Sequence, residues 1–158
     1  MAIRKIVTLG DEVLRKTSRP VVNFNEKLWQ LLDDMKDTMN KAEGVGLAAV
    51  QVGVLRRVVV IDVGDGLMEL INPEIIEVSG EQEGQEGCLS LPGRFGIVKR
   101  PNYVKLRAQN RKGQWKLYEG TELKARAFCH ELEHLDGKLY IDVETKELTA
   151  EEILADRN

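Results

Sequence analysis

Three features that would place many proteins in a class are scarce or absent in this 158-residue chain. No apolar run is long enough for a signal peptide or a membrane span, so we expect a cytoplasmic protein. The two cysteines, Cys88 and Cys129, are too few for a disulfide scaffold, which leaves free thiols, a single bridge or metal ligands. The net charge of −3 excludes bulk electrostatic attraction to nucleic acid or to anionic membranes.

What is present is typical of a globular protein. Hydrophobic residues make up 42% of the chain and charged residues 31%, without internal repeats or low-complexity linkers. The length suits one domain with a hydrophobic core, so we expect residues 1–158 to form a single domain. An apolar stripe at helical spacing predicts an amphipathic helix that begins near Asn25 and ends before Gly44. The stripe consists of Leu28, Leu31, Leu32, Met35, Met39 and Ala42.

Short strand-like runs follow this helix, and a turn at residues 110–113 joins the last two into a hairpin. The runs cover residues 57–63, 67–71, 103–109 and 114–118.

Glycine-rich segments and a second helix complete the pattern. Residues 44–53 are too rich in glycine for a helix or a strand and too apolar for a solvated loop, and residues 83–96 are predicted as a structured loop. The second helix is expected from about Thr121, its N-cap, to Gly137, its C′ residue. Several strands and then a helix, without regular βαβ alternation, indicate an α+β fold.

The second predicted helix carries both histidines of the chain, in the sequence HELEH. A step of 100° per residue places His130 and His134 about 40° apart, so both imidazoles project from one face, as chelation of one ion requires. Leu123 and Ala127 share the face of the histidines, and the opposite face is also apolar. A helix that is apolar on two faces packs between two layers of the fold, so we expect the histidines to be buried. Buried neutral imidazoles need partners, and a metal ion can supply one. The apolar face carries Phe128, Leu132, Leu135 and Leu139.

Two histidines do not complete a metal site, which needs a third protein ligand and an open position for water. The longer HExxHxxGxxH pattern is excluded because Tyr140 stands where its third histidine is required. Cys129 lies about 120° from the midpoint of the histidines and is better explained as a small buried residue. Cys88, in a glycine-bracketed segment, is the leading candidate. Downstream glutamates remain open, namely Glu144, Glu147, Glu151 and Glu152.

The spacing also leaves the general base undecided. Glu131 and Glu133 lie about 80° to either side of the midpoint of the histidines. The known mechanics of HExxH favour Glu131, which directly follows the first histidine. Taken alone, the motif also fits a zinc endopeptidase of a different HExxH lineage, or a binding module in which it holds no metal.

Three motifs together resemble one family, the peptide deformylases. GVGLAAVQVG (Gly44–Gly53) is similar to the first motif of the family, EGCLSLP (Glu86–Pro92) matches the second, and HELEH (His130–His134) is the third. The N-terminal IVTLGDEVLRKTSRPV is also similar in type, so the likeness spans most of the chain. The resemblance implies an α+β fold with antiparallel sheets packed around a central helix that bears HExxH.

The resemblance implies a metal-dependent amidohydrolase. Such an enzyme removes the formyl group from the N-terminal formylmethionine of newly synthesised proteins and releases formate, with a metal-activated water as nucleophile. Cys88, His130 and His134 would hold one divalent ion per chain, Fe²⁺ in the native enzyme, with Zn²⁺, Ni²⁺ or Co²⁺ as substitutes.

The resemblance also implies roles for residues around the metal. Glu131 would act as general acid and base. Gln51 and the backbone N–H of Leu89 would face the formyl oxygen, and Gly46 would contact the backbone of the bound peptide. The methionine side chain would occupy an apolar pocket near the glycine-rich segment and the metal-binding helix.

The implied partners are N-formylmethionyl nascent peptides, and we also consider the ribosome near its exit tunnel. Direct binding of nucleic acid or membrane is not expected. The chain departs from the family at Glu133, where most members carry aspartate, and at Arg94 and Phe95, where the family often carries a basic or polar residue. These departures concern peptide contacts and leave the metal chemistry unchanged.

Overall fold

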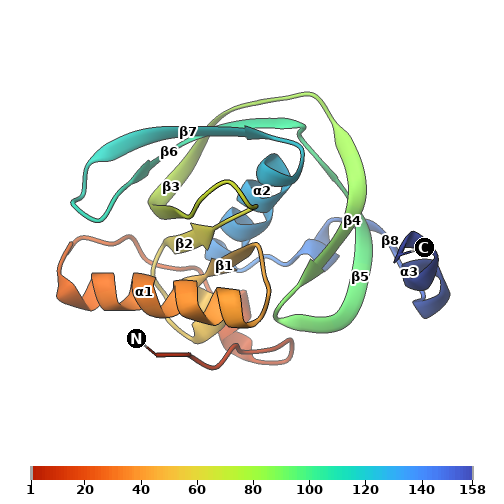
Figure 1. Ribbon diagram of the computed structural model, residues 1–158, viewed down its shortest axis with the longest axis horizontal. Coiled ribbons are helices and arrows are strands. Elements are labelled where there is room, and N and C mark those ends of the chain that lie inside the picture. Colours follow the sequence, from red (N-terminus) through yellow and green to blue (C-terminus); the bar gives the residue numbers. More distant parts are fainter. Residues whose placement is uncertain (1, 158) are drawn as a thin grey trace.

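The computed structural model describes residues 2–157, which form helices and two antiparallel sheets (Figure 1). The α-helices are α1 (Glu26–Lys41), α2 (Leu123–Leu135) and α3 (Ala150–Arg157), and the 3-10 helices are η1 (Glu12–Arg15), η2 (Ala49–Val52) and η3 (Tyr140–Asp142). The strands are β1 (Gly46–Ala48), β2 (Val58–Ile61), β3 (Met68–Ser79), β4 (Gln82–Cys88), β5 (Leu91–Arg100), β6 (Tyr103–Gln109), β7 (Trp115–Thr121) and β8 (Glu144–Glu147). None of the helices in this part of the chain is long and apolar enough to cross a membrane.

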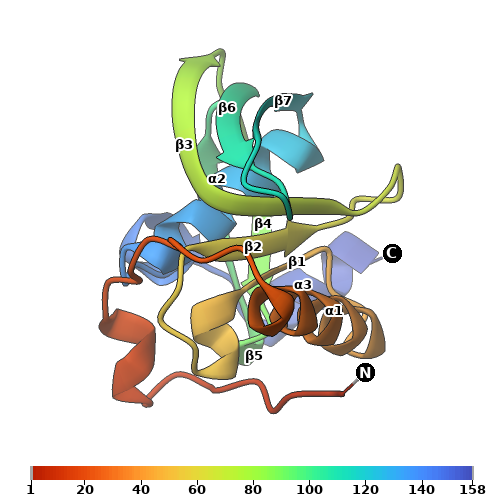
Figure 2. The same cartoon turned by 90° about the vertical axis from the view of Figure 1, so that its left-hand side faces the viewer.

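The two sheets enclose α2. One sheet has five strands in the order β1-β2-β3-β6-β7, and the other has three in the order β4-β5-β8. Every pairing within these sheets is antiparallel. Figures 1 and 2 show α2 near the centre of the molecule, with α1 covering β1 and β2 from outside. The α+β fold, with antiparallel sheets around the central helix, is therefore confirmed.

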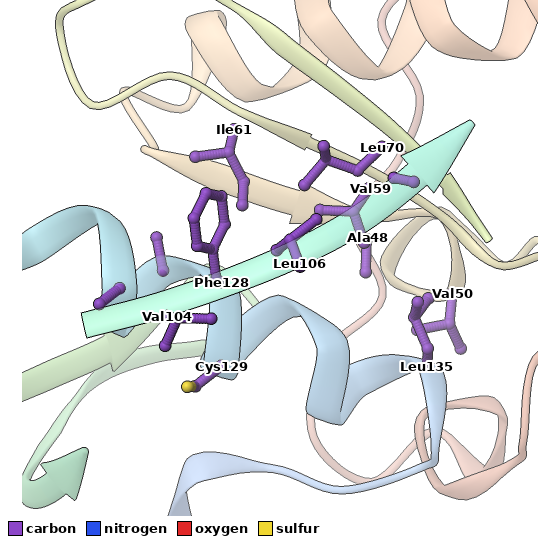
Figure 3. Packing of buried hydrophobic residues seen from close by; sticks show 13 residues of the cluster. Ala48, Val50, Val59, Ile61, Leu70, Val104, Leu106, Phe128, Cys129 and Leu135 are labelled. Atoms are coloured by element: carbon purple, nitrogen blue, oxygen red, sulfur yellow. The ribbon is translucent and has the colours of Figure 1, made fainter. Parts of the chain in front are cut away.

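Strand β2 is buried on both faces, which explains its unbroken apolar sequence VVVI. Side chains alternate between the faces of a strand, so Val58 and Val60 pack against α1 while Val59 and Ile61 pack against α2. Figure 3 shows Phe128 of α2 pointing toward Ile61 in this core. The strand fixes both helices to one sheet.

Helix α1 begins as predicted and ends by a different route. Asn25 accepts a hydrogen bond from the N–H of Leu28 at 3.3 Å, which caps the helix. The left-handed residue that ends the helix is Glu43, with φ 57°, rather than Gly44. Gly44 is needed for another reason, because a Cβ there would lie 2.8 Å from Cδ1 of Leu89.

Both glycine-rich segments are largely regular structure. The prediction that residues 44–53 form neither helix nor strand was wrong, and so was the prediction of a loop at residues 83–96. Residues 44–53 contain β1 and η2, and residues 83–96 form most of the β4–β5 hairpin. The glycines reflect close packing rather than a free loop: a Cβ on Gly87 would lie 2.6 Å from the ring of Phe95 on the paired strand. The expected strand at residues 67–71 is also only the start of β3.

Helix α2 starts one residue later than expected. Glu122, with φ 54° and no side-chain cap, precedes it, so the prediction of Thr121 as N-cap was wrong. The predicted end is confirmed: Gly137 has φ 73° and donates its N–H to the carbonyl of His134 at 3.1 Å.

Candidate metal centre

The histidines of α2 lie side by side inside the fold. His130 is 8% exposed and His134 is 1% exposed, and their ring centroids are 5.1 Å apart. Residues Glu86 and Cys88 of β4 contact the two rings, which therefore lie between the helix and the β4–β5–β8 sheet. Bulk water cannot satisfy their nitrogen atoms there. The burial expected from the two apolar faces of the helix is confirmed.

Cys88 reaches the histidines from the end of β4. A register shift between Gly87 and Cys88 interrupts the pairing with β5, and such bulges redirect side chains. The Sγ atom of Cys88 lies 3.3 Å from Nε2 of His134, and one ligand atom from each of Cys88, His130 and His134 lies within 4.8 Å of the others. This is the group in the described residues that could hold a metal ion.

The other thiol and the downstream glutamates lie outside this group. Cys129 packs in the hydrophobic core, where burial raises the pKa of its thiol to about 11. Glu144 and Glu147 form ion pairs with Arg94 at 3.6 and 3.1 Å. Arg94, one of the positions that departs from the family, therefore joins β5 to the chain after α2.

His130 is held in one orientation by Glu86. Its Nδ1 lies 2.9 Å from Oε1 of Glu86, a carboxylate that also accepts hydrogen bonds from Arg100 at 2.8 and 2.9 Å and from Arg126 at 2.6 Å. Burial alone would raise the pKa of Glu86, but the hydrogen bonds from Arg100 and His130 lower it to about 2. Because an ionised carboxylate cannot donate, Nδ1–H of His130 is the donor and Nε2 is left for a metal.

His134 is suited to the same ion. Burial, together with the charge of His130, lowers its pKa well below the usual value, which favours the neutral form that binds metals. The ring of Tyr140 stacks on His130 with 6.0 Å between centroids. One thiolate and two imidazoles, buried and oriented in this way, fit a borderline divalent cation.

Glu131 faces the cleft without a hydrogen-bond partner for its buried Oε1 among the described residues. Burial raises its pKa to about 7, although the positive charge of His130 opposes this rise. A Cβ on Gly46 would lie 2.5 Å from Oε2 of Glu131, so the glycine of β1 permits the approach of this carboxylate.

Glu133 has a different environment. Its Oε1 accepts a hydrogen bond from Arg100 at 2.8 Å. The carboxylate is therefore already paired, whereas that of Glu131 is free to exchange a proton. The structure distinguishes two glutamates that helical spacing could not.

Gln51 lies beside Cys88 and is 1% exposed. Its Oε1 accepts the N–H of Ala48 at 2.9 Å, and this fixes the amide so that Nε2 faces Ser90 at 3.1 Å and Cys88 at 3.5 Å. The side chain of Gln51 is thus presented to the cleft by η2, next to the ligand group.

These groups meet in a cleft of about 590 Å³. One wall is the segment Gly44–Gly46, the opposite wall runs along the β4–β5 turn, and α2 forms the floor. Leu89, Leu123 and Ala127 give the cleft apolar surface near the three ligands.

Three residues that support the ligand group were not predicted from the sequence. Glu86 lies within the EGCLSLP motif, which was a usable signal. Arg100 and Arg126 carried no local signal, because their partners are distant in sequence.

Comparison with known families shows to which family the chain belongs. The family model for polypeptide deformylase matches residues 3–149. The chain belongs to the polypeptide deformylase family.

Relatives named peptide deformylase match nearly the whole chain. That of Caldanaerobacter subterraneus subsp. tengcongensis is 56% identical over 153 residues, covering 97% of this chain and 96% of the relative. That of Acetivibrio thermocellus is 61% identical over 142 residues, covering 90% of this chain and 84% of the relative.

Solved deformylase structures have the same fold. The crystal structure of peptide deformylase from Thermotoga maritima has a TM-score of 0.90 at 41% identity and covers 92% of this chain and 99% of its own. That from Legionella pneumophila has a TM-score of 0.88 at 43% identity and covers 99% of this chain and 92% of its own.

Deformylases are metal-dependent hydrolases that remove N-formyl groups from nascent peptides, and this chain is such an enzyme. The alternatives of a zinc endopeptidase from another lineage and of a binding module without metal are not favoured.

Proposed function

We propose that Cys88, His130 and His134 hold one divalent metal ion, and that Glu131 is the general acid and base for hydrolysis of the formyl group. The observation that carries this proposal is the convergence of three candidate ligand atoms beside a carboxylate that has no hydrogen-bond partner in the described part of the chain. When bound, the ion lowers the pKa of a water molecule and polarises a carbonyl group. Glu131 takes the proton of the attacking water and delivers it to the leaving amine.

Gln51 and the backbone N–H of Leu89 then hold the formyl oxygen as negative charge develops on it. The fixed amide of Gln51 supports this role, because a donor oriented in advance needs no reorganisation during the reaction. The N–H of Leu89 makes no backbone hydrogen bond in the described residues, so it is available as a second donor. Loss of one such donor typically lowers kcat by about two to three orders of magnitude.

The peptide lies along the cleft, with its backbone against Gly46 and its methionine side chain on Leu89, Leu123 and Ala127. The apolar surface near the ligand group supports this placement. We infer that residues 1–158 act as one catalytic domain on N-formylmethionyl nascent peptides in the cytoplasm, near the exit tunnel of the ribosome. Cosedimentation with translating ribosomes tests the last point, and no direct contact with nucleic acid or membrane is expected.

The metal is proposed to be Fe²⁺ in the native enzyme, with Zn²⁺, Ni²⁺ and Co²⁺ as functional substitutes. A thiolate with two imidazoles accepts each of these ions. Across the first-row divalent metals, affinity alone favours Co²⁺, Ni²⁺ and Zn²⁺ over Fe²⁺. Anaerobic purification followed by metal analysis should give one equivalent per chain.

The deciding experiment compares three variants by metal content and by formate release from formyl-Met-Ala-Ser. Glu131→Gln should keep the metal and lose activity, whereas Cys88→Ser should lose both. Glu133→Gln is the matched control, because it removes a carboxylate that is already paired with Arg100, and it should keep most of its activity. Full activity in Glu131→Gln would refute the role of the base, and unchanged metal content in Cys88→Ser would refute the ligand set.

A further inference from the structure

A second cavity, of about 580 Å³, lies at the start of α1, far from the metal centre. It is enclosed by the N-terminal segment 19–25, the first turns of α1 and the segment that follows η2. It shares no lining residue with the catalytic cleft, which adjoins the other end of α1. A 16-residue helix is roughly 24 Å long, and Figure 1 shows α1 running from its free end to the end beside β1 and β5.

Positive charge lines this cavity, which we call the α1 N-terminal pocket (Arg4, Arg19–Asn23, Asn25, Lys27, Leu28, Leu31, Gly53, Val54 and Arg56). No lining residue is acidic, although the whole chain has a net charge of −3. Arg4 is paired with Asp34 at 3.0 Å. Arg19, Lys27 and Arg56 are exposed and form no ion pair with the side chains that the structure describes, those of residues 2–153. The start of α1 adds the positive end of the helix dipole, so the pocket selects an anion.

The floor of the pocket is aliphatic. Val21, Leu28 and Leu31 are 6–8% exposed there, and Val54 is partly buried beside them. A phosphodiester backbone has no aliphatic group to place on such a floor, and a flat bilayer surface cannot enter a concave site. The ligand must therefore combine negative charge with an aliphatic side group.

The segment along the pocket also offers free backbone groups. Both backbone groups of Val21 are fixed by the side chain of Asn72, at 2.8 and 2.9 Å. The following residues belong to no helix or strand, and the N–H groups of Val22 and Asn23 donate no hydrogen bond within the described residues. Val22 is 80% exposed. An extended peptide can pair with such a segment through its main chain.

The geometry points to an extended acidic peptide segment of a partner protein as the occupant of the α1 N-terminal pocket. Its carboxylates would contact Arg19, Lys27 and Arg56, and an aliphatic side chain between them would cover the floor. Because this pocket and the catalytic cleft lie at opposite ends of α1, the partner would leave the cleft open to substrate. The inference stands apart from the assignment of the catalytic residues.

The test is a titration of zinc-loaded, ¹⁵N-labelled protein with the peptide acetyl-Asp-Glu-Leu-Glu-Asp-amide, followed by amide chemical shifts. The neutral peptide acetyl-Asn-Gln-Leu-Gln-Asn-amide is the matched probe. We expect saturable shifts at residues 21–27 and 53–56 with the acidic peptide only, and weaker binding at higher salt.

Variants then locate the site. Arg19→Gln with Arg56→Gln should raise the Kd about tenfold, because exposed charge contacts are individually modest. Lys116→Gln with Lys138→Gln removes the same charge from exposed positions outside the pocket and should leave the Kd unchanged. Formate release should be the same in both double variants.

The inference is overturned if no shifts appear, if the neutral peptide gives the same shifts, or if the two double variants weaken binding equally. Preferential binding of a decameric uridine RNA, or of anionic vesicles, through the same residues would also overturn it.

Discussion

Replacing Glu86 by glutamine should weaken both the fold and the hold on the metal. The substitution keeps the shape of the side chain and removes its charge. Arg100 and Arg126, whose guanidinium groups are buried against Glu86, would lose their shared carboxylate. Removal of one partner from a buried ion pair typically costs about 3–5 kcal/mol.

The pKa of Glu86 gives a similar magnitude. Each pKa unit corresponds to ~1.4 kcal/mol, so the fall from 4.5 to about 2 corresponds to about 3 kcal/mol of stability in the metal-free protein. Because the folded-state pKa is lowered, this stability is fully present above pH 4.5 and is lost as the pH falls toward about 2. The glutamine variant should lack this pH-dependent component.

Urea unfolding of the metal-free proteins measures the effect. At neutral pH the variant should lose about 3 kcal/mol, and its melting temperature should fall by roughly 6–12 °C. Zinc affinity should fall by about 10- to 100-fold, because His130 loses the acceptor that orients its ring. Glu83→Gln, on the same strand but exposed, is the matched control and should remain within about 0.5 kcal/mol of the parent. A Glu86→Gln protein with unchanged stability and zinc affinity would refute this reasoning.

Three further substitutions probe single features. Gly46→Ala would place a Cβ 2.5 Å from Oε2 of Glu131. The kcat for formate release should therefore fall by at least about tenfold while the metal content is unchanged. A normal kcat would contradict the close approach of the two residues. Gly137→Ala imposes φ 73° on a residue with a Cβ and brings that atom against the carbonyl of Arg15, so thermal melting should show a loss of more than about 1 kcal/mol. Asn25→Ala removes the cap of α1 and should cost about 1 kcal/mol in urea unfolding, with activity preserved.

The sequence predicted the elements that rest on local patterns. The apolar stripe and Asn25 located α1, and Gly137 located the end of α2, because caps and periodicity depend on near neighbours. The β4–β5 hairpin was mistaken for a loop because its glycines are required by contacts across the sheet. Gly87 faces Phe95, eight positions away along the chain, and no local rule reveals that contact.

At the site, the sequence by itself predicted the two histidines as metal ligands. The four-residue spacing of His130 and His134 aligns their rings on any regular helix, and the motif around Cys88 pointed to the third ligand through its resemblance to deformylases. The family matches bear out the enzyme class.

Only the tertiary structure shows that Glu133 is paired with Arg100 and that Glu131 faces the cleft without a hydrogen-bond partner among the described residues. Helical spacing places Glu131 and Glu133 symmetrically about the histidines. The choice depends on Arg100, which β5 brings to within 2.8 Å of Glu133, and on Gly46, which leaves space for Glu131 beside the cleft. Both neighbours are distant in sequence, and the proton affinity of a carboxylate depends on what surrounds it in space.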